Sequence, residues 1–433
     1  MSLCSVQLLK DKGIEQGIIT IFPVKLHTPH INKYRRKSSW FLIVGGTVYL
    51  LIKLVFNGVK KNRLKIKRRY QVLFYVPNNK YKRFVDALTE NVSFSYLIIG
   101  EEIYDPSVVS VDDYKLLHFK NYPLRLFREL YNLFLHSLKT NQLSDFRKNY
   151  WNILSLVRRD LTVNALFKQT AFDKYFSFHP VEGFHQVIQN FYKDNFKETF
   201  AIRPTTTSMS KEHQFISTDN MFYKTDNELQ IYQRSNLKSL NLIKGGLIAN
   251  PKPITENNNK KGILFLDTCT NVNPASIAIR REVISQFLNL ISKFNEDVYY
   301  RFHPGLIESE EKLTKREIGS FANPKIKIIN ADIPWDKIKV AFGFDTTLYY
   351  DCFLYEIPVI SFRGEYYLFP NKTNEFTNSP VIPINNESDF KAITKLLDDQ
   401  SFWKHKKDEQ FLWFSKQYNF PEGMEAIKGI LAK

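Results

Sequence analysis

The sequence predicts an α/β protein with two Rossmann-like domains that face a cleft, preceded by a basic N-terminal extension. Short apolar runs alternate with helical stretches twice along the chain, and a cluster of turn-forming residues separates the two series. The length of 433 residues suits two or three domains of about 100–200 residues each. Hydrophobic residues make up 43% of the chain and charged residues 24%, so there is enough apolar surface to bury real cores.

The positive charge is concentrated in the extension, which we place at residues 1–69. This segment contains 15 Lys and Arg side chains and two acids, a net charge of +13. The remaining 364 residues hold 46 basic and 42 acidic side chains, a net charge of only +4. The folded body therefore lacks the basic footprint of a nucleic-acid binder, and we expect no nucleic-acid partner. Three cysteines are too few for a disulfide framework, which favours a cytoplasmic location.

Within the extension, an apolar segment at Trp40–Val59 lies between basic runs at Lys33–Lys37 and Lys60–Arg69. Its length would just span a bilayer at about 20 residues, but both flanks are positive and Lys53 would lie in the hydrocarbon. A segment in the membrane interface fits both facts better, and a core element is the alternative. We expect residues 33–69 to contact an anionic membrane surface, making the protein peripheral on the inner face of the plasma membrane.

The first domain is expected at residues 70–246 and begins with a βαβ unit. A polar loop is expected from Pro204–Ser208 onward. The predicted strands are Tyr70–Val76, Phe94–Ile99, Lys174–Phe178 and Glu198–Ile202, and the predicted helices are Tyr81–Leu88, Leu124–Leu138, Tyr150–Val163 and Gln186–Asp194.

The second domain is expected at residues 247–433, after a linker marked by Gly245, Gly246, Pro251 and Asn257–Lys261. There the strand–helix alternation restarts. The predicted strands are Gly262–Leu266, Asp297–Phe302, Lys325–Ile329, Val340–Phe344 and Pro358–Phe362, and the predicted helices are Ala278–Phe294 and Thr347–Leu354.

The end of the strand at Asp297–Phe302 carries the strongest chemical signal. Alternation along the strand places Arg301 and His303 on one face, and Pro304 ends the strand there. Ligands of open α/β sheets bind beyond the carboxyl ends of the strands, and a guanidinium with an imidazole suits phosphate oxygens. The alternative is local, with His303 bonded to a nearby carbonyl and Arg301 paired with a surface acid.

A second signal follows the strand at Val340–Phe344, where Asp345, Thr346 and Thr347 lead into a helix. The free N–H groups of a helix start and two adjacent hydroxyls are donors for a phosphate. Helix capping by Asp345 or Thr346 is the alternative. Together with the His-Pro strand end, this turn predicts a two-sided phosphate pocket in the second domain.

A basic strand ending in His-Pro, a loop with proline and an acid at Ile333–Asp336, and a strand leading to paired hydroxyls together resemble bacterial GT-B glycosyltransferases. The resemblance covers roughly Gly262–Leu397 and is greatest to CMP-sugar enzymes, the sialyltransferases and Kdo transferases of capsule and lipo-oligosaccharide assembly. CDP-glycerol-type polymer transferases are more distant. In the family the histidine and the paired hydroxyl residues contact the nucleotide phosphate, which implies this role for His303, Thr346 and Thr347.

The resemblance implies a glycosyltransferase that works without metal or cofactor. It would move a sugar, sialic acid or a related acidic sugar, from a CMP-linked nucleotide-sugar donor to a surface polysaccharide or glycolipid. The first domain would bind this glycan or glycolipid acceptor and the second would bind the donor. The alternatives are a UDP- or GDP-sugar transferase or a CDP-polyol transferase of the same fold, and a non-catalytic protein that binds polyanions or membranes.

The general base is poorly marked, because the acidic motif usual in the first domain of the family has no clean copy here. Glu182 or His179, which follow a predicted strand, are our candidates, and together with His185 they could face the cleft. These three side chains match no standard metal-ligand spacing. Glu101 and Glu102, at the end of another strand, are the competing candidates.

Overall fold

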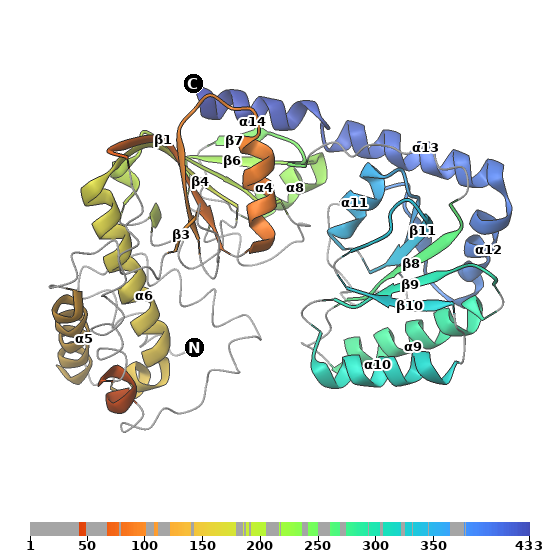
Figure 1. Ribbon diagram of the computed structural model, residues 1–433, viewed down its shortest axis with the longest axis horizontal. Coiled ribbons are helices and arrows are strands. Elements are labelled where there is room, and N and C mark those ends of the chain that lie inside the picture. Colours follow the sequence, from red (N-terminus) through yellow and green to blue (C-terminus); the bar gives the residue numbers. More distant parts are fainter. Residues whose placement is uncertain are drawn as a thin grey trace.

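The computed structural model describes most of the chain from residue 67 onward and a short helix at 43–48 before it (Figure 1). The described residues are 43–48, 67–77, 79–100, 108–110, 122–139, 143–178, 185, 188–189, 192–204, 216, 218–235, 241–249, 260–268, 274–292, 294–303, 306–321, 325–330, 332–344, 346–363, 376 and 378–433. Most of the expected extension lies outside them, including the whole of the first basic run and residues 60–66 of the second.

The N-terminal domain contains a seven-stranded sheet in the order β3-β2-β1-β4-β5-β6-β7, in which every described pair of neighbours is parallel. The order reverses between β1 and β4, which are adjacent. The strands are β1 (Arg69–Val76), β2 (Tyr96–Gly100), β3 (Val108–Ser110), β4 (Ala171–Ser177), β5 (Glu198–Ile202), β6 (Asn220–Tyr223) and β7 (Asn241–Lys244). The helices are α4 (Asn79–Thr89), α5 (Tyr122–Lys139), α6 (Leu143–Gln169), the short η4 (Lys193–Asn195) and α8 (Asp226–Arg234).

The C-terminal domain repeats this plan with a six-stranded parallel sheet in the order β10-β9-β8-β11-β12-β13. Here the order reverses between β8 and β11. The strands are β8 (Gly262–Leu266), β9 (Val298–Arg301), β10 (Ile326–Ile329), β11 (Ile338–Gly343), β12 (Val359–Phe362) and β13 (Ile382–Ile384). The helices are α9 (Pro274–Ile291), α10 (Glu308–Ser320), α11 (Leu348–Leu354), η7 (Glu387–Phe390), α12 (Lys391–Asp398), α13 (Gln400–Gln417) and α14 (Glu422–Ala432).

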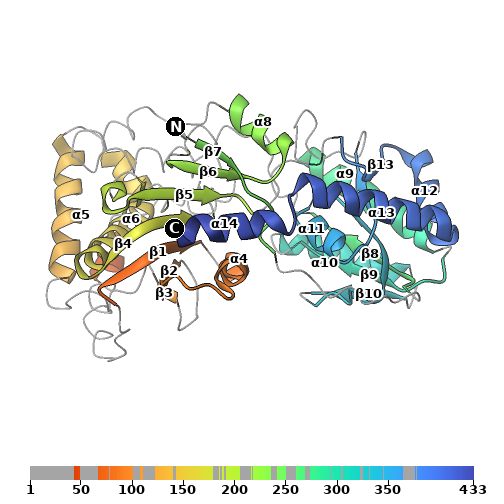
Figure 2. The same cartoon turned by 90° about the horizontal axis from the view of Figure 1, so that it is seen from above.

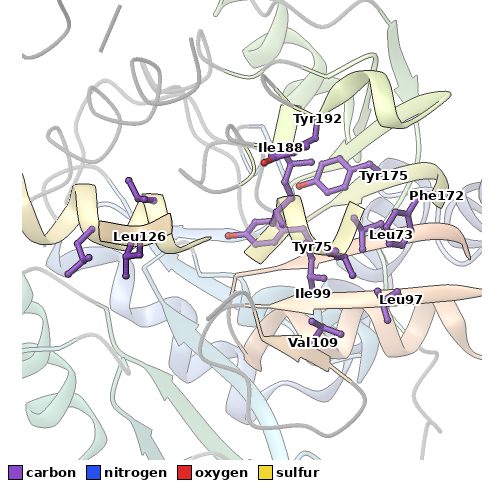
Figure 3. Close-up of a cluster of buried hydrophobic side chains, with 14 of the residues drawn as sticks. Leu73, Tyr75, Leu97, Ile99, Val109, Leu126, Phe172, Tyr175, Ile188 and Tyr192 are labelled. Carbon is purple, nitrogen blue, oxygen red and sulfur yellow. The ribbon is translucent and has the colours of Figure 1, made fainter. Parts of the chain in front are cut away.

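Each sheet is covered on both faces, as parallel sheets require. In β1, Leu73 and Tyr75 point into the cluster that contains side chains of α5 and α6 (Figure 3). Val72 and Phe74 point to the opposite face, where α4 and α14 pack. This alternation explains why strands buried on both faces appear in the sequence as continuous apolar runs, and it confirms the predicted α/β fold class.

The start of the predicted linker, residues 245–248, is buried and joins both cores. Leu247 belongs to the core of the C-terminal domain, whereas its neighbour Ile248 belongs to that of the N-terminal domain. The backbone N–H of Gly245 donates to the carbonyl of Tyr223, and that of Leu247 donates to the carbonyl of Tyr418. The crossing between the domains is therefore held by hydrogen bonds and by apolar contacts.

The last helix returns to the first domain. Seen in both views, α13 lies along the C-terminal domain and α14 continues over the N-terminal sheet (Figures 1 and 2). Met424, Ile427 and Leu431 are buried in the N-terminal core, and the ammonium of Lys174 on β4 donates to the carbonyl of Ile430 at 2.7 Å. The sequence-based division at 246/247 stays a prediction. Helix α14, which follows that division in the sequence, packs on the N-terminal domain.

The start of α14 touches the linker so closely that only glycine fits. A Cβ on Gly423 would lie 2.6 Å from the carbonyl oxygen of Gly245 and 2.6 Å from the Cα of Gly246. We expect Gly423→Ala to lower the free energy of unfolding by about 1–3 kcal/mol, because backbone would have to move. Gly429→Ala, in the same helix with open space around it, is the control and should be neutral or stabilising. Equal melting temperatures for the two variants would show that the contact does not matter.

Candidate active site

The carboxyl ends of the central strands define the candidate site. In open parallel sheets, ligands bind where the strand order reverses, which in the C-terminal domain is the end of β8 and β11. The neighbouring strand β9 ends at Arg301 on the same edge. The candidate residues of this domain therefore follow strands at the carboxyl edge of the sheet, where a ligand is expected to bind.

Arg301 is half-buried, and its side chain has a donor to spare. Its Nε donates to the carbonyl of Asn330 at 2.9 Å, while its Nη1 is buried and makes no hydrogen bond to the described residues. Burial is the main cause of a lowered pKa for Arg301, partly offset by the nearby Asp351 carboxylate. A buried guanidinium N–H without an acceptor is costly, so an anionic oxygen placed there would be bound favourably.

The two domains meet beside Arg301. Arg83 on α4 of the N-terminal domain lies 3.8 Å from the Asp351 carboxylate on α11 of the C-terminal domain. Arg83 and Asp351 are also the two charged groups that most affect the pKa of Arg301. Because α4 follows β1 and α11 follows β11, the carboxyl edges of the two sheets face each other at this cluster, which neither motif in the sequence indicated.

His303 is exposed two residues beyond Arg301, and its carbonyl accepts a hydrogen bond from the backbone N–H of Leu306. Arg301 is the last residue of β9 and His303 follows it by two residues. That the two side chains share one face stays a prediction. Pro304, which was expected to end the strand, lies outside the described residues.

Thr346 and Thr347 precede α11 and are half-buried. The hydroxyl of Thr346 accepts from the N–H of Leu348 at 3.4 Å, a long contact, and Thr347 makes no side-chain capping bond. The helix has only seven residues and carries Asp351 in its first turn, so it attracts an anion less than a long helix would. Strand β8 lies between β9 and β11, so His303 and the threonine pair do not follow neighbouring strands. Asp345 lies outside the described residues.

A buried charge network fixes the end of β8. The Asp267 carboxylate accepts two hydrogen bonds from the fully buried Arg280 on α9, at 2.8 and 2.6 Å, and a third from the Tyr300 hydroxyl at 3.0 Å. Arg280 also donates to Thr314 and lies 3.6 Å from Glu310, both on α10. Burial disfavours the Arg280 charge, yet the bonds to Asp267 outweigh it and raise the pKa of the guanidinium. The network joins β8, β9, α9 and α10 behind the candidate site.

On the N-terminal side, β4 ends at Ser177 beside β1, where the strand order reverses. The proposed bases His179 and Glu182 follow it and lie outside the described residues, as do Glu101 and Glu102. Their roles stay predictions.

The expectation that His185 faces the cleft is wrong. The side chain is fully buried in the N-terminal domain. Its ring stacks on Tyr175 with centroids 5.6 Å apart, and its Nδ1 lies 3.1 Å from the Tyr175 hydroxyl. Tyr175 on β4 packs against the imidazole inside the core, and an acceptor substrate could not reach a side chain buried there. Among the described residues, no cluster of three His, Cys, Asp or Glu side chains suited to a metal ion occurs.

One surface pocket of about 300 Å³ lies elsewhere, at the amino ends of β1 and β4. Arg68, Lys168, Thr170 and Asn195 are among the residues that line it. Parallel sheets bind substrates at the opposite edge, so we do not assign this pocket to catalysis.

Comparison with known proteins supports the fold. No protein-family model and no curated protein matches the sequence. Among solved structures, the N-terminal domain of trehalose-6-phosphate phosphatase from Candida albicans has a TM-score of 0.51 at 12% identity, over 86% of this chain and 98% of that one. MnaA of S. aureus in a UDP co-structure has a TM-score of 0.49 at 13% identity, over 82% and 94%. UDP-GlcNAc 2-epimerase of Methanocaldococcus jannaschii has 0.48 at 12%, over 83% and 99%.

The likeness with the TM-score of 0.51 extends over both domains and agrees with the sheet topology described above. It confirms the sequence-based prediction of two Rossmann-like domains in the GT-B arrangement. At 12% identity it shows the fold and no more.

Proposed function

We propose that the protein is a glycosyltransferase that uses a nucleotide-linked sugar donor and a glycan or glycolipid acceptor. The observation that carries the proposal is Arg301, whose buried Nη1 has no acceptor among the described residues at the edge where the two sheets face each other. A donor phosphate is the group that such a guanidinium binds best. The GT-B arrangement supports this function by analogy of fold.

In the proposed mechanism the C-terminal domain stabilises the leaving group. As the bond from the sugar to the donor phosphate breaks, negative charge grows on the phosphate oxygens. Arg301 would bind these oxygens, with His303 and the hydroxyls of Thr346 and Thr347 as further donors. A base on the N-terminal domain, with His179 and Glu182 as the candidates, would take the proton of the acceptor hydroxyl.

The nucleobase of the donor is where the sequence-based expectation and the solved structures differ. A CMP-linked donor was expected from the sequence, whereas two of the solved structures named above are described with UDP and none with CMP. The CMP-linked donor stays a prediction, and the UDP-sugar alternative is tested ahead of it.

A thermal-shift screen of UDP, CMP, CDP and GDP tests the proposal. A nucleotide that binds only the native state adds about 2.7 kcal/mol of stability at a hundred times its dissociation constant, which raises the melting temperature. We expect one nucleotide to do so with the wild type and to lose most of its effect with Arg301→Gln. If all four leave the melting temperature unchanged while a sulfated polysaccharide raises it, the non-catalytic polyanion-binding alternative is favoured.

Localisation is also a proposal. We propose that the basic residues 33–69 hold the enzyme on the anionic inner face of the plasma membrane, beside a lipid-linked acceptor. Among the described residues, none of the helices is both long and apolar enough to cross a bilayer.

A further inference from the structure

Helix α5 carries a row of large apolar side chains on the protein surface. The exposed fractions are 68% for Leu124, 53% for Phe127, 50% for Tyr131 and 47% for Leu138. At 3.6 residues per turn these positions fall within an arc of about 60° on the helix. Phe127 and Tyr131 stack on each other, with ring centroids 6.1 Å apart. The row is thus an apolar stripe along the exposed side of the helix.

The stripe is not needed for the core, because α5 packs with a different face. Leu126 and Leu130 are buried in the N-terminal core. Phe134 contacts Phe146 of α6 with ring centroids 6.1 Å apart. Since the packed face fixes the rotation of the helix, the stripe cannot turn inward.

The 43–48 helix adds to the same surface. Ile43 is buried in the cluster that contains Leu126 and Leu130, and the hydroxyl of Thr47 is hydrogen-bonded to that of Tyr150 on α6. Val44 and Val48 are 59% and 49% exposed. Six of the ten exposed large hydrophobic side chains among the described residues therefore lie on α5 and this short helix. Both lie at the outer end of the N-terminal domain, away from the other domain (Figures 1 and 2).

Positive charge accompanies the apolar side chains. Arg125, Arg128 and Lys139 are exposed on α5. Within the described part of the chain, the acidic partner of Arg128 is Glu129, at 3.5 Å. The 43–48 helix belongs to the apolar segment that the sequence places between two basic runs. Apolar side chains beside cations are typical of elements that lie in the interface of an anionic bilayer, where the cations contact headgroups and the apolar groups reach the acyl boundary.

We propose that α5 and the 43–48 helix form one membrane-docking surface, with the stripe from Leu124 to Leu138 lying in the interface of an anionic bilayer. This adds a folded contact to the basic extension and does not rest on the proposed enzymatic function. The surface lies on the domain expected to bind the acceptor, so docking would keep the site near lipid-linked substrates.

Flotation of the full-length protein with vesicles tests the proposal without donor or acceptor. The triple variant Leu124→Ser/Phe127→Ser/Tyr131→Ser keeps the basic extension intact and changes only exposed side chains. We expect it to partition at least tenfold more weakly onto phosphatidylglycerol-containing vesicles, with an unchanged melting temperature. Leu412→Ser on α13, which is 70% exposed on the other domain, is the matched control and should bind as the wild type does.

The charged residues give a second measurement. Arg125→Gln/Arg128→Gln should weaken binding to anionic vesicles and make the remainder less sensitive to salt, with no effect on phosphatidylcholine vesicles. The proposal is overturned if the triple variant binds vesicles as the wild type does. It is also overturned if that variant changes only the sedimentation behaviour, because the stripe would then be a contact between copies of the chain. If the triple variant has a lower melting temperature, the proposal is judged from the Arg125→Gln/Arg128→Gln variant instead. Wild-type binding of that variant to anionic vesicles would then overturn the proposal.

Discussion

Replacement of Arg280 by alanine is expected to lower the free energy of unfolding by about 3–5 kcal/mol. The guanidinium has no exposed surface. Among the described residues, its removal leaves the buried Asp267 carboxylate with two donors, the Tyr300 hydroxyl and the backbone N–H of Thr268. A buried charge without its partner costs far more than an exposed one. Denaturant unfolding followed by far-UV circular dichroism measures this loss.

Lys312→Ala is the matched control for Arg280. Lys312 also forms an ion pair, with Glu308 on α10, but both side chains are more than half exposed. Exposed pairs one helical turn apart contribute about 0.3–0.5 kcal/mol, so this variant should be close to the wild type. Similar losses for the two variants would mean that burial does not set the strength of the Asp267–Arg280 pair.

The second large effect is expected on activity. Arg301→Gln should lower the transfer rate by about 10²–10³-fold and weaken donor binding, because it removes a charged donor from the growing charge on the leaving phosphate. The only described hydrogen bond of the side chain is to the carbonyl of Asn330, so the fold should survive. Arg301→Lys keeps the charge but loses the planar fork, and we expect an intermediate rate.

Two measurements separate the role of Arg301 from a general effect. Donor affinity by calorimetry and turnover with saturating acceptor are compared with those of Arg316→Gln, an exposed arginine on α10 of the same domain. The control should match the wild type in both. If Arg301→Gln keeps wild-type affinity and turnover, Arg301 does not bind the donor phosphate and the proposed site is wrong.

The sequence predicts the central strands of both sheets well, because strands buried on both faces consist of apolar residues. It does not predict β6 and α8, and there the reason is chemical. Asn220, Lys224 and Glu228 are polar residues that are nonetheless buried. Lys224 bonds to Glu228 and to the carbonyl of Arg203, so the charges satisfy each other inside the domain. A segment rich in such residues appears in a sequence as a polar loop.

The candidate site is predicted only in part for a related reason. Arg301 and His303 were found because alternation along one strand fixes their common edge. Arg83 and Asp351 come close only when the two domains are placed together, and no local pattern contains that information. Asp267 had a usable signal, since an acid directly after a buried strand lies at a sheet edge. Its partner Arg280 had no such signal. Arg280 and Arg281 are adjacent in the sequence, and the packing of α9 buries Arg280 but leaves Arg281 partly exposed.

Because α14 packs on the N-terminal sheet, the first domain to be synthesised is not the first domain to complete its core. The strands of the first domain are translated early, but the apolar face of β1 that contains Val72 and Phe74 gains part of its cover only when residues 422–432 have been made. The second domain has most of its core from α9 to α13 before that point. A nascent chain interrupted between α13 and α14 therefore carries a nearly complete second domain and a first domain whose apolar face, covered by α4 but not by α14, is still partly accessible to chaperones.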